Sequence, residues 1–209
     1  MPGLSSLQLQ VFRKYLEPFV QFSEEEWSIF CKHLLLRTLK RKSRFVSGGK
    51  ICNEVGFILD GSFRFYFVKD GVEISNYFSF QNEFISSYRS FLKREASLIY
   101  VEAMQDSLVI SFSYASIQEL LKDERMVLKM ERFGRMIAEY LICCYEDRVI
   151  SFVTQTPEER YRRLLENGDG LLQRIPQHYL ANYLGITPVS LSRIRKRIFA
   201  SGRRQKLAS

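Results

Sequence analysis

The spacing of apolar residues changes character along the chain. Between residues 44 and 112, aromatic and β-branched residues come in short runs separated by turn residues, which is typical of β-strands. From 123 to 152, apolar residues recur at steps of four and three, which is the period of a helix. Beyond residue 156, short helical patterns are separated by Gly and Pro. The order is therefore a β-rich part, one long helix and a small helical part.

Two Asp-Gly pairs mark expected turns in the β-rich part. Asp60-Gly61 and Asp70-Gly71 are each flanked by aromatic and β-branched residues. Asp-Gly tolerates the positive φ angles of a type I′ turn, so each pair predicts a hairpin. Several short strands at regular spacing indicate a sandwich or small barrel. We expect these strands near 55–59, 62–68, 72–80, 98–104 and 107–112.

The first clear helix begins at the segment SEEEW. Ser23 can cap this helix while Glu26 reaches back to the cap, which is a capping box. Phe22 and Trp27 hold the two positions of a hydrophobic staple. The pattern predicts a helix over about 23–35 that packs on the residues following it.

The segment from Asp123 to Phe152 contains neither Pro nor a turn cluster. As a helix it would be about 45 Å long at ~1.5 Å per residue, more than a domain this small can cover. This length favours pairing with the same helix of a second copy, although one amphipathic helix lying on its own domain is the alternative. The heptad seam predicted to form the dimer interface consists of Met126, Met130, Phe133, Ile137, Tyr140 and Cys144.

Charge is concentrated at the end of the chain. The sequence has 31 Lys and Arg, 23 Asp and Glu, and a formal net charge of +8. Residues 170–209 contain eight of the cations and no acid, so residues 1–169 are balanced. A segment with this imbalance attracts polyanions, although a solvated basic tail would have the same composition.

The basic segment also contains a helix-turn-helix pattern. QHYLANYL predicts one helix, and Gly185 can end it in the left-handed conformation. Thr187 can cap a second helix that has Pro188 at its first position. Leu191 and Ile194 of that helix are spaced to face inward. Two helices joined by so short a turn predict a DNA-binding module.

The outer side of the second helix is predicted to meet double-stranded DNA. Arginine can bind a guanine edge bidentately in the major groove, while other cations contact phosphates. The candidate DNA-contacting residues are Thr187, Val189, Ser190, Ser192, Arg193, Lys196 and Arg197.

Other chemistry finds little support in the sequence. The four cysteines have no metal-ligand spacing and there are only two histidines, so we expect neither a metal nor a cofactor. No Walker-type loop and no nucleophile elbow occurs, and we do not expect an enzyme. No run approaches the ~18 apolar residues of a membrane span. The first residues lack a signal-peptide pattern, so we expect a cytoplasmic protein without a membrane partner.

GITPVSLSRIRKRI resembles the recognition signature of the Crp/Fnr superfamily of bacterial transcription regulators, and EERYRRLL resembles the helix that opens that family's DNA-binding domain. The resemblance implies an α+β fold with a jelly-roll-like, cyclic-nucleotide-binding-like β-roll, a long dimerisation helix and a C-terminal winged helix-turn-helix. The corresponding domains are 1–122, 123–153 and 154–209. It also implies a homodimer that binds two DNA half-sites. RNA polymerase is a further candidate partner.

The resemblance assigns roles within the recognition helix. Arg193 matches the family's base-reading arginine, and Ser192 matches the serine that often precedes it. Val189 stands where many members carry Glu, and its side chain suits a thymine methyl group instead. The half-site is therefore expected to differ from that of members with Glu.

The effector site is expected to be degenerate. Members that bind cyclic AMP carry Gly-Glu for the ribose and Arg-Ser for the phosphate, but Ser86-Ser87 and Ser97-Leu98 stand at these positions. Without the arginine the phosphate lacks its main counter-charge. We therefore expect a regulator that cyclic AMP does not control, with an unknown small-molecule effector left open. The candidate pocket residues are Phe84, Ser86, Ser87, Arg89, Ser97 and Leu98.

A second function remains open from the sequence. The chain could be a small-molecule or cyclic-nucleotide sensor whose C-terminal helices contact only protein. The acid-free Arg and Lys face of the second helix argues against this alternative, because such a face suits a polyanion.

Overall fold

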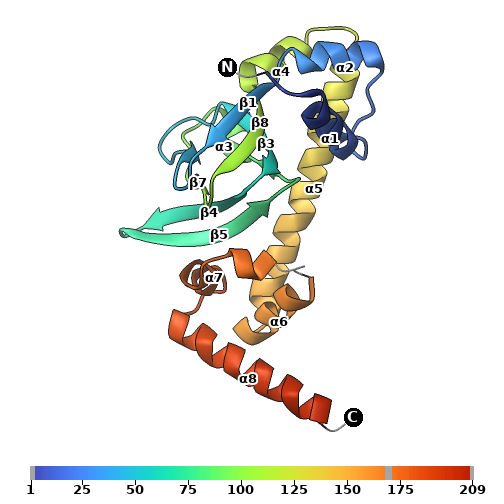
Figure 1. The fold of residues 1–209 in the computed structure, drawn as a ribbon. Helices are drawn as coiled ribbons and strands as arrows, with labels where there is room; N and C mark the ends of the chain where they lie inside the picture. The colour runs from blue at the N-terminus through green and yellow to red at the C-terminus, as the bar shows by residue number, and fades with distance from the viewer. Residues whose placement is uncertain (1–2, 168–170, 208–209) are drawn as a thin grey trace. The chain divides into compact units, whose positions relative to one another are not determined.

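The computed structural model describes residues 3–167 and 171–207 (Figure 1). The chain forms two compact units, an N-terminal unit (Met1–Ile142) and a C-terminal unit (Cys143–Ser209). The boundary lies within helix α5 (Val127–Thr154). The sequence pattern sets this helix apart as a domain over 123–153, whereas the structure divides it between the two units.

Two antiparallel four-stranded sheets form the β-part of the N-terminal unit. The strand order is β1-β8-β3-β6 in sheet A and β2-β7-β4-β5 in sheet B. The five predicted strands are confirmed as β3, β4, β5, β7 and β8. The bounds are β1 (Leu35–Leu39), β2 (Arg44–Val46), β3 (Glu54–Asp60), β4 (Ser62–Lys69), β5 (Val72–Phe80), β6 (Phe84–Ile85), β7 (Tyr100–Ala103) and β8 (Ser107–Ser113).

The two Asp-Gly pairs have different roles in the sheets. Asp70 and Gly71 have φ angles of 52° and 77°, as a type I′ turn requires, and they join the paired strands β4 and β5. Asp60-Gly61 instead joins strands of different sheets, so the hairpin predicted there is wrong. Gly61 has a φ of 122°, and a Cβ at this position would lie 2.9 Å from the Cα of Ser107. Glycine is therefore required where the chain passes from sheet A to sheet B.

Alternating side chains of sheet A contribute to two hydrophobic cores. Ile58 and Val109 belong to a core shared with residues of β4 and β7, which lies between the sheets. Phe57 and Ile110, the neighbouring residues, belong to a second core shared with helices. The antiparallel sheets with separate helices make the fold α+β, as the sequence predicts.

The helices of the second core are α1 (Ser6–Leu16), α2 (Glu24–Cys31), α4 (Tyr114–Leu120) and the first turns of α5 (Figure 1). Phe12 of α1 is fully buried, with its ring centroid 4.8 Å from that of Phe57. The predicted staple is present, because the ring centroids of Phe22 and Trp27 lie 6.0 Å apart. Aromatic rings thus fasten the N-terminal helices to sheet A.

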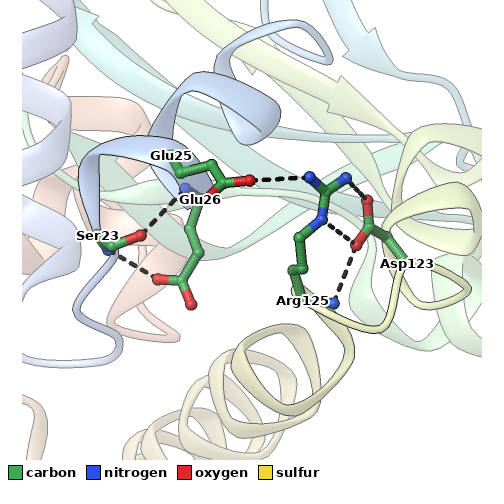
Figure 2. Close-up of polar contacts among 5 residues, drawn as sticks. All are labelled: Ser23, Glu25, Glu26, Asp123 and Arg125. Carbon is green, nitrogen blue, oxygen red and sulfur yellow. Dashed lines mark hydrogen bonds and ion pairs between the residues drawn. The ribbon is translucent and has the colours of Figure 1, made fainter.

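Polar contacts tie α2 to the turn before α5 (Figure 2). The predicted capping box is confirmed: Ser23 N donates to Glu26 Oε2 at 2.7 Å, and Glu26 N donates to Ser23 Oγ at 3.2 Å. Arg125 donates to Glu25 Oε1 at 3.0 Å and to Asp123 Oδ2 at 2.7 Å. These side chains lie at the surface, so they add less to stability than the aromatic core beside them.

The C-terminal unit is helical. After the end of α5 come α6 (Pro157–Asn167), a 3₁₀ turn (Leu171–Arg174), α7 (Gln177–Tyr183) and α8 (Pro188–Leu207). Residues 143–167 and 171–207 contain no strand, so the wing expected from the resemblance is not found in this part of the chain. Instead α8 continues for 20 residues beyond the turn.

Truncating Phe12 should destabilise the N-terminal unit strongly. We expect Phe12→Ala to lower the free energy of unfolding by about 3–5 kcal/mol, because the cavity it leaves is walled by other rings. Leu7→Ala in the same helix should cost less than about 0.5 kcal/mol, since Leu7 is 70% exposed. Urea unfolding followed by the fluorescence of Trp27, the only tryptophan, measures both. Equal losses would contradict the packing described.

Candidate nucleic-acid interface

The two helices of the predicted helix-turn-helix pack through a small apolar core. Leu180, Ala181 and Leu184 on the α7 side are 3%, 0% and 0% exposed, and Leu191 and Ile194 of α8 are 0% and 6% exposed. Ala181 has the small side chain that allows two helices to cross closely. This packing fixes one face of α8 and leaves the opposite face outside the core.

The turn is closed by backbone hydrogen bonds. Gly185 has a φ of 73°, the left-handed conformation that the sequence predicts. Its N–H donates to Asn182 O and the N–H of Ile186 donates to Ala181 O, both at 3.0 Å. This pair of bonds is a Schellman motif, which ends α7. The sequence signal for it is the single glycine.

The start of α8 is capped as predicted. Ser190 N donates to Thr187 Oγ1 at 3.2 Å, and the two hydroxyl groups lie 3.0 Å apart. Pro188 occupies the first helical position, where its missing N–H has no intrahelical acceptor. Two of the predicted DNA-contacting residues therefore also shape the helix that carries them.

The outward face of α8 carries four of the predicted DNA-contacting residues. Val189 is 61% exposed, and Ser192, Arg193 and Lys196 are exposed as well. Their spacing of three and four residues brings them to one side of the helix. Within the described residues, the side chain of neither Arg193 nor Lys196 forms a hydrogen bond or an ion pair. Both cations thus remain available to an external anion.

Arg197 is placed differently from the other predicted residues. It donates through Nη2 and Nε to Glu158 Oε2 of α6, at 2.6 and 3.1 Å. Arg162 donates to the other oxygen of Glu158 at 2.9 Å. Hydrogen bonds from Arg162 and then Arg197 hold the pKa of Glu158 below its usual value. Arg197 thus links α8 to α6, and 63% of its side chain remains exposed.

The side chains of the predicted effector residues lie in different environments. Phe84 lies in the helix-side aromatic core, 5.3 Å from the ring centroid of Phe57. Arg89 is exposed and pairs with Glu95 at 3.2 Å, and Leu98 is 66% exposed. These residues therefore lie in three different environments.

The three predicted serines near α3 (Tyr88–Lys93) form hydrogen bonds with other groups of the protein. Ser97 Oγ donates to Ser87 Oγ at 2.9 Å, and both residues are buried. Ser86 Oγ donates to Glu54 O at 3.1 Å. The structure also reveals Arg94, whose Nη1 donates to Cys52 O at 2.9 Å and whose guanidinium carbon lies 4.0 Å from the ring centroid of Tyr114. No sequence signal distinguishes this anchored arginine from a surface cation.

The structure divides the six residues predicted to form the dimer seam. Met126, Met130 and Phe133 are buried in the helix-side core of their own unit, and Ile137 packs against that core. Tyr140 is 52% exposed and Cys144 is half-buried. The first part of the pattern therefore reflects packing of α5 on its own unit, which is the alternative given by the sequence. These buried side chains are not available to a partner.

Another apolar row is exposed along the second half of α5. Ile142, Tyr145 and Val149 are 59%, 58% and 60% exposed, and they recur at steps of three and four. The sequence contains this row as plainly as the buried one. The predicted dimer seam does not include this row, because periodicity alone does not show which apolar row the folded chain buries.

Metal-ligand groups and membrane-spanning helices are both absent from the described part of the chain. It contains no group of three His, Cys, Asp or Glu side chains that could share a metal ion. None of the helices in residues 3–167 and 171–207 is long and apolar enough to cross a membrane.

Solved structures share this fold. FixK2 from Bradyrhizobium japonicum has a TM-score of 0.65 at 16% identity, over 81% of this chain and 86% of that chain. The c-di-GMP responsive global regulator CLP of Xanthomonas campestris has a TM-score of 0.64 at 14% identity, over 84% and 91%. The Thermus thermophilus catabolite activator protein has a TM-score of 0.51 at 18% identity, over 87% and 85%. No family model and no curated protein matches the sequence.

These likenesses show that the chain shares the fold of these three proteins. At identities of 14–18% they establish the fold alone.

Acid should loosen the attachment of α8 to α6. Because the pKa of Glu158 is lowered in the folded protein, its ion pairs contribute fully above the unfolded pKa of about 4.3. This contribution is lost as the pH falls through the lower, folded pKa. We therefore expect Glu158→Gln to be less stable than the wild type near neutral pH and to approach it in acid. Thermal unfolding followed by circular dichroism across this pH range measures the difference.

The matched control is Glu166→Gln, which removes an exposed carboxylate from the same helix. Its unfolding temperature should follow that of the wild type throughout. A difference between Glu158→Gln and the wild type that did not change with pH would refute the role given to the ion pairs.

Proposed function

We propose that the chain is a sequence-specific, double-stranded DNA-binding transcription regulator that acts in the cytoplasm as a homodimer. The observation that carries this proposal is the outward face of α8, where Arg193 and Lys196 are exposed opposite a buried apolar side. A helix held in this way fits the major groove of B-DNA. The fold shared with known regulators supports the same function.

The residues of α8 have distinct roles in this proposal. Arg193 binds a guanine edge through two hydrogen bonds, and Val189 contacts a thymine methyl group. Lys196 contacts phosphate and supplies affinity without sequence information. Thr187 and Ser190 lie at the amino-terminal end of α8, where hydroxyl groups and the helix dipole favour a phosphate oxygen.

A second copy covers the exposed row on α5. Ile142, Tyr145 and Val149 have the spacing of a helix–helix seam, and their exposure of 58–60% leaves a large apolar surface in contact with water. Pairing two such helices removes that surface from water and brings two recognition helices into one molecule. A homodimer of this kind binds two half-sites about one helical turn apart. RNA polymerase is the partner through which such a dimer would regulate transcription.

Cyclic AMP does not control this regulator in our proposal. The position of the phosphate-binding arginine is held by Ser97, which is buried and bonded to Ser87. The nearby cations Arg89 and Arg94 are engaged with Glu95 and with the Cys52 carbonyl group. A cyclic phosphate would therefore find neither of these two guanidinium groups free of another contact.

The sensor that contacts only protein is the competing function. It shares the β-roll, but it gives no role to the cations on the outward face of α8. Salt dependence separates the two, because displacement of counterions from DNA makes binding weaken steeply as salt rises.

Selection of bound sites from random double-stranded DNA tests the proposed function. We expect a palindromic site to be enriched, and the same site to appear with and without cyclic AMP. A parallel arm contains c-di-GMP, since one structural neighbour responds to that nucleotide. Enrichment of no sequence would contradict the proposal, and enrichment only with cyclic AMP would contradict its ligand-independent part.

Two substitutions test the roles within α8. Arg193→Ala should remove about 1–3 kcal/mol of binding free energy from the selected site and leave binding to random DNA nearly unchanged. Lys196→Ala should weaken binding to both DNAs to a similar extent and reduce the salt dependence. Titrations of the selected and a scrambled duplex at two salt concentrations measure these effects. Equal losses on both DNAs for both variants would refute the assignment.

A charge placed in the exposed row of α5 should dissociate the dimer. We expect Val149→Asp to sediment as a species of 24.6 kDa, while the wild type has twice that mass. Leu92→Asp is the matched control, because Leu92 is exposed (54%) but lies on α3. Analytical ultracentrifugation decides between them, with circular dichroism confirming that both variants are folded. A wild-type monomer, or a Val149→Asp dimer, would rule out this interface.

A further inference from the structure

The end of α5, the start of α6 and the turn of the helix-turn-helix meet at one aromatic ring, that of Phe152. The guanidinium carbon of Arg148 lies 4.2 Å from the ring centroid, and that of Arg160 lies 4.5 Å from it. The turn approaches the same ring, since a Cβ built on Gly185 would lie 3.6 Å from a ring carbon. All four residues belong to the C-terminal unit.

Both guanidinium groups donate to carbonyl oxygens at the carboxyl end of α7. Arg148 Nη2 donates to Tyr183 O at 2.7 Å, and Arg160 Nη2 donates to Leu184 O at 2.9 Å. Such oxygens have no intrahelical partner and carry a partial negative charge. The two preceding carbonyls, of Ala181 and Asn182, accept the Schellman hydrogen bonds. The arginines therefore satisfy the remaining acceptors at this helix end.

Arg160 also holds the segment that links α5 to α6. Its Nη1 donates to Gln155 O at 2.5 Å and to Ser151 O at 3.4 Å. Arg148 projects from α5 itself, and its guanidinium carbon lies 3.6 Å from the ring centroid of Tyr183. Contacts of both arginines therefore run from the last turns of α5 to the turn between α7 and α8.

Burying the guanidinium groups of Arg148 and Arg160 costs free energy. Arg160 is only 8% exposed, and burial lowers the pKa of Arg148. Two neighbouring cations that are partly removed from water are stable only with good hydrogen-bond partners, and apolar residues could fill the same space. What apolar residues could not supply is directional bonding to the α7 carbonyls.

We propose that Arg148 and Arg160 are positioning residues for DNA reading, which fix the turn, and with it α8, to the carboxyl end of α5. This inference rests on the proposed function. In a dimer built through α5, the separation and angle of the two recognition helices are then set by the helices that form the interface. Sequence specificity and half-site spacing depend on two residues that lie away from the outward face of α8.

Lysine substitutions test the inference, because they keep the charge and remove the planar fork of donors. We expect Arg148→Lys and Arg160→Lys to lower the ratio of selected-site to random-DNA affinity about tenfold, the effect of one mismatched base pair. Random-DNA affinity should stay within about twofold of the wild type, since it depends on the cations. The tolerated half-site spacings should broaden. The matched control is Arg163→Lys, an exposed position on α6.

A purely structural role predicts another result. Loss of folded protein weakens binding to both DNAs equally, so an unchanged affinity ratio and an unchanged spacing preference in both lysine variants would overturn the inference. Circular dichroism gives the folded fraction of each variant, and affinities are expressed per folded molecule.

Amide hydrogen exchange supplies a readout that does not involve DNA. The amides of Gly185 and Ile186, which close the turn, should exchange faster in Arg148→Met and Arg160→Met, while those of α1 stay unchanged. Unchanged protection of the turn would refute the inference whatever the DNA results. If the wild type selects no DNA sequence, the proposed function fails, and hydrogen exchange alone decides whether the arginines hold the turn.

Discussion

The fixed turn between α7 and α8 is the constraint on which the candidate interface depends. A recognition helix can present one chosen face to DNA only if the protein holds its opposite face and the turn before it. Leu191 and Ile194 hold the face, and the Schellman hydrogen bonds at Gly185 and Ile186 hold the turn. Every one of these contacts lies within the C-terminal unit. These contacts therefore shape the interface without residues of the N-terminal unit.

The parts of the fold that the sequence predicts well have causes within a few residues. The capping box of Ser23 and Glu26, the left-handed Gly185 and the Thr187 cap each act within one helical turn, and each lies where predicted. Asp60-Gly61 shows the limit of such local signals. It has the same dipeptide as the hairpin turn that follows, yet β3 pairs with β8, a strand far along the chain, and the hairpin is not formed.

The candidate site shows the same limit. The helical pattern around Arg197 predicts a DNA contact. Its carboxylate partner, Glu158, lies 39 residues earlier, and no local pattern indicates that pairing. Likewise α5 contains two apolar rows of similar period. The row that includes Met130 and Phe133 is buried in a core of its own unit, where the ring of Phe133 lies near those of Phe19 and Phe112, and the row at Tyr145 is exposed. Which row a helix buries depends on tertiary packing, so periodicity predicts the helix but not its partner.

The bonded serines of the β-roll bear on how the proposed regulator could be controlled. A ligand shifts an equilibrium only by the difference in its affinity for two states. A ligand that replaced the Ser87–Ser97 hydrogen bond, or displaced Phe91, which is 4% exposed in the core between the sheets, would have to offset the loss of those contacts. If no phosphate–arginine pair forms there, as proposed above, little interaction energy offsets that loss. In the proposed dimer, by contrast, DNA binding is linked to association through α5, and mass action makes occupancy depend on protein concentration. Control by the amount of protein therefore requires no ligand site at all.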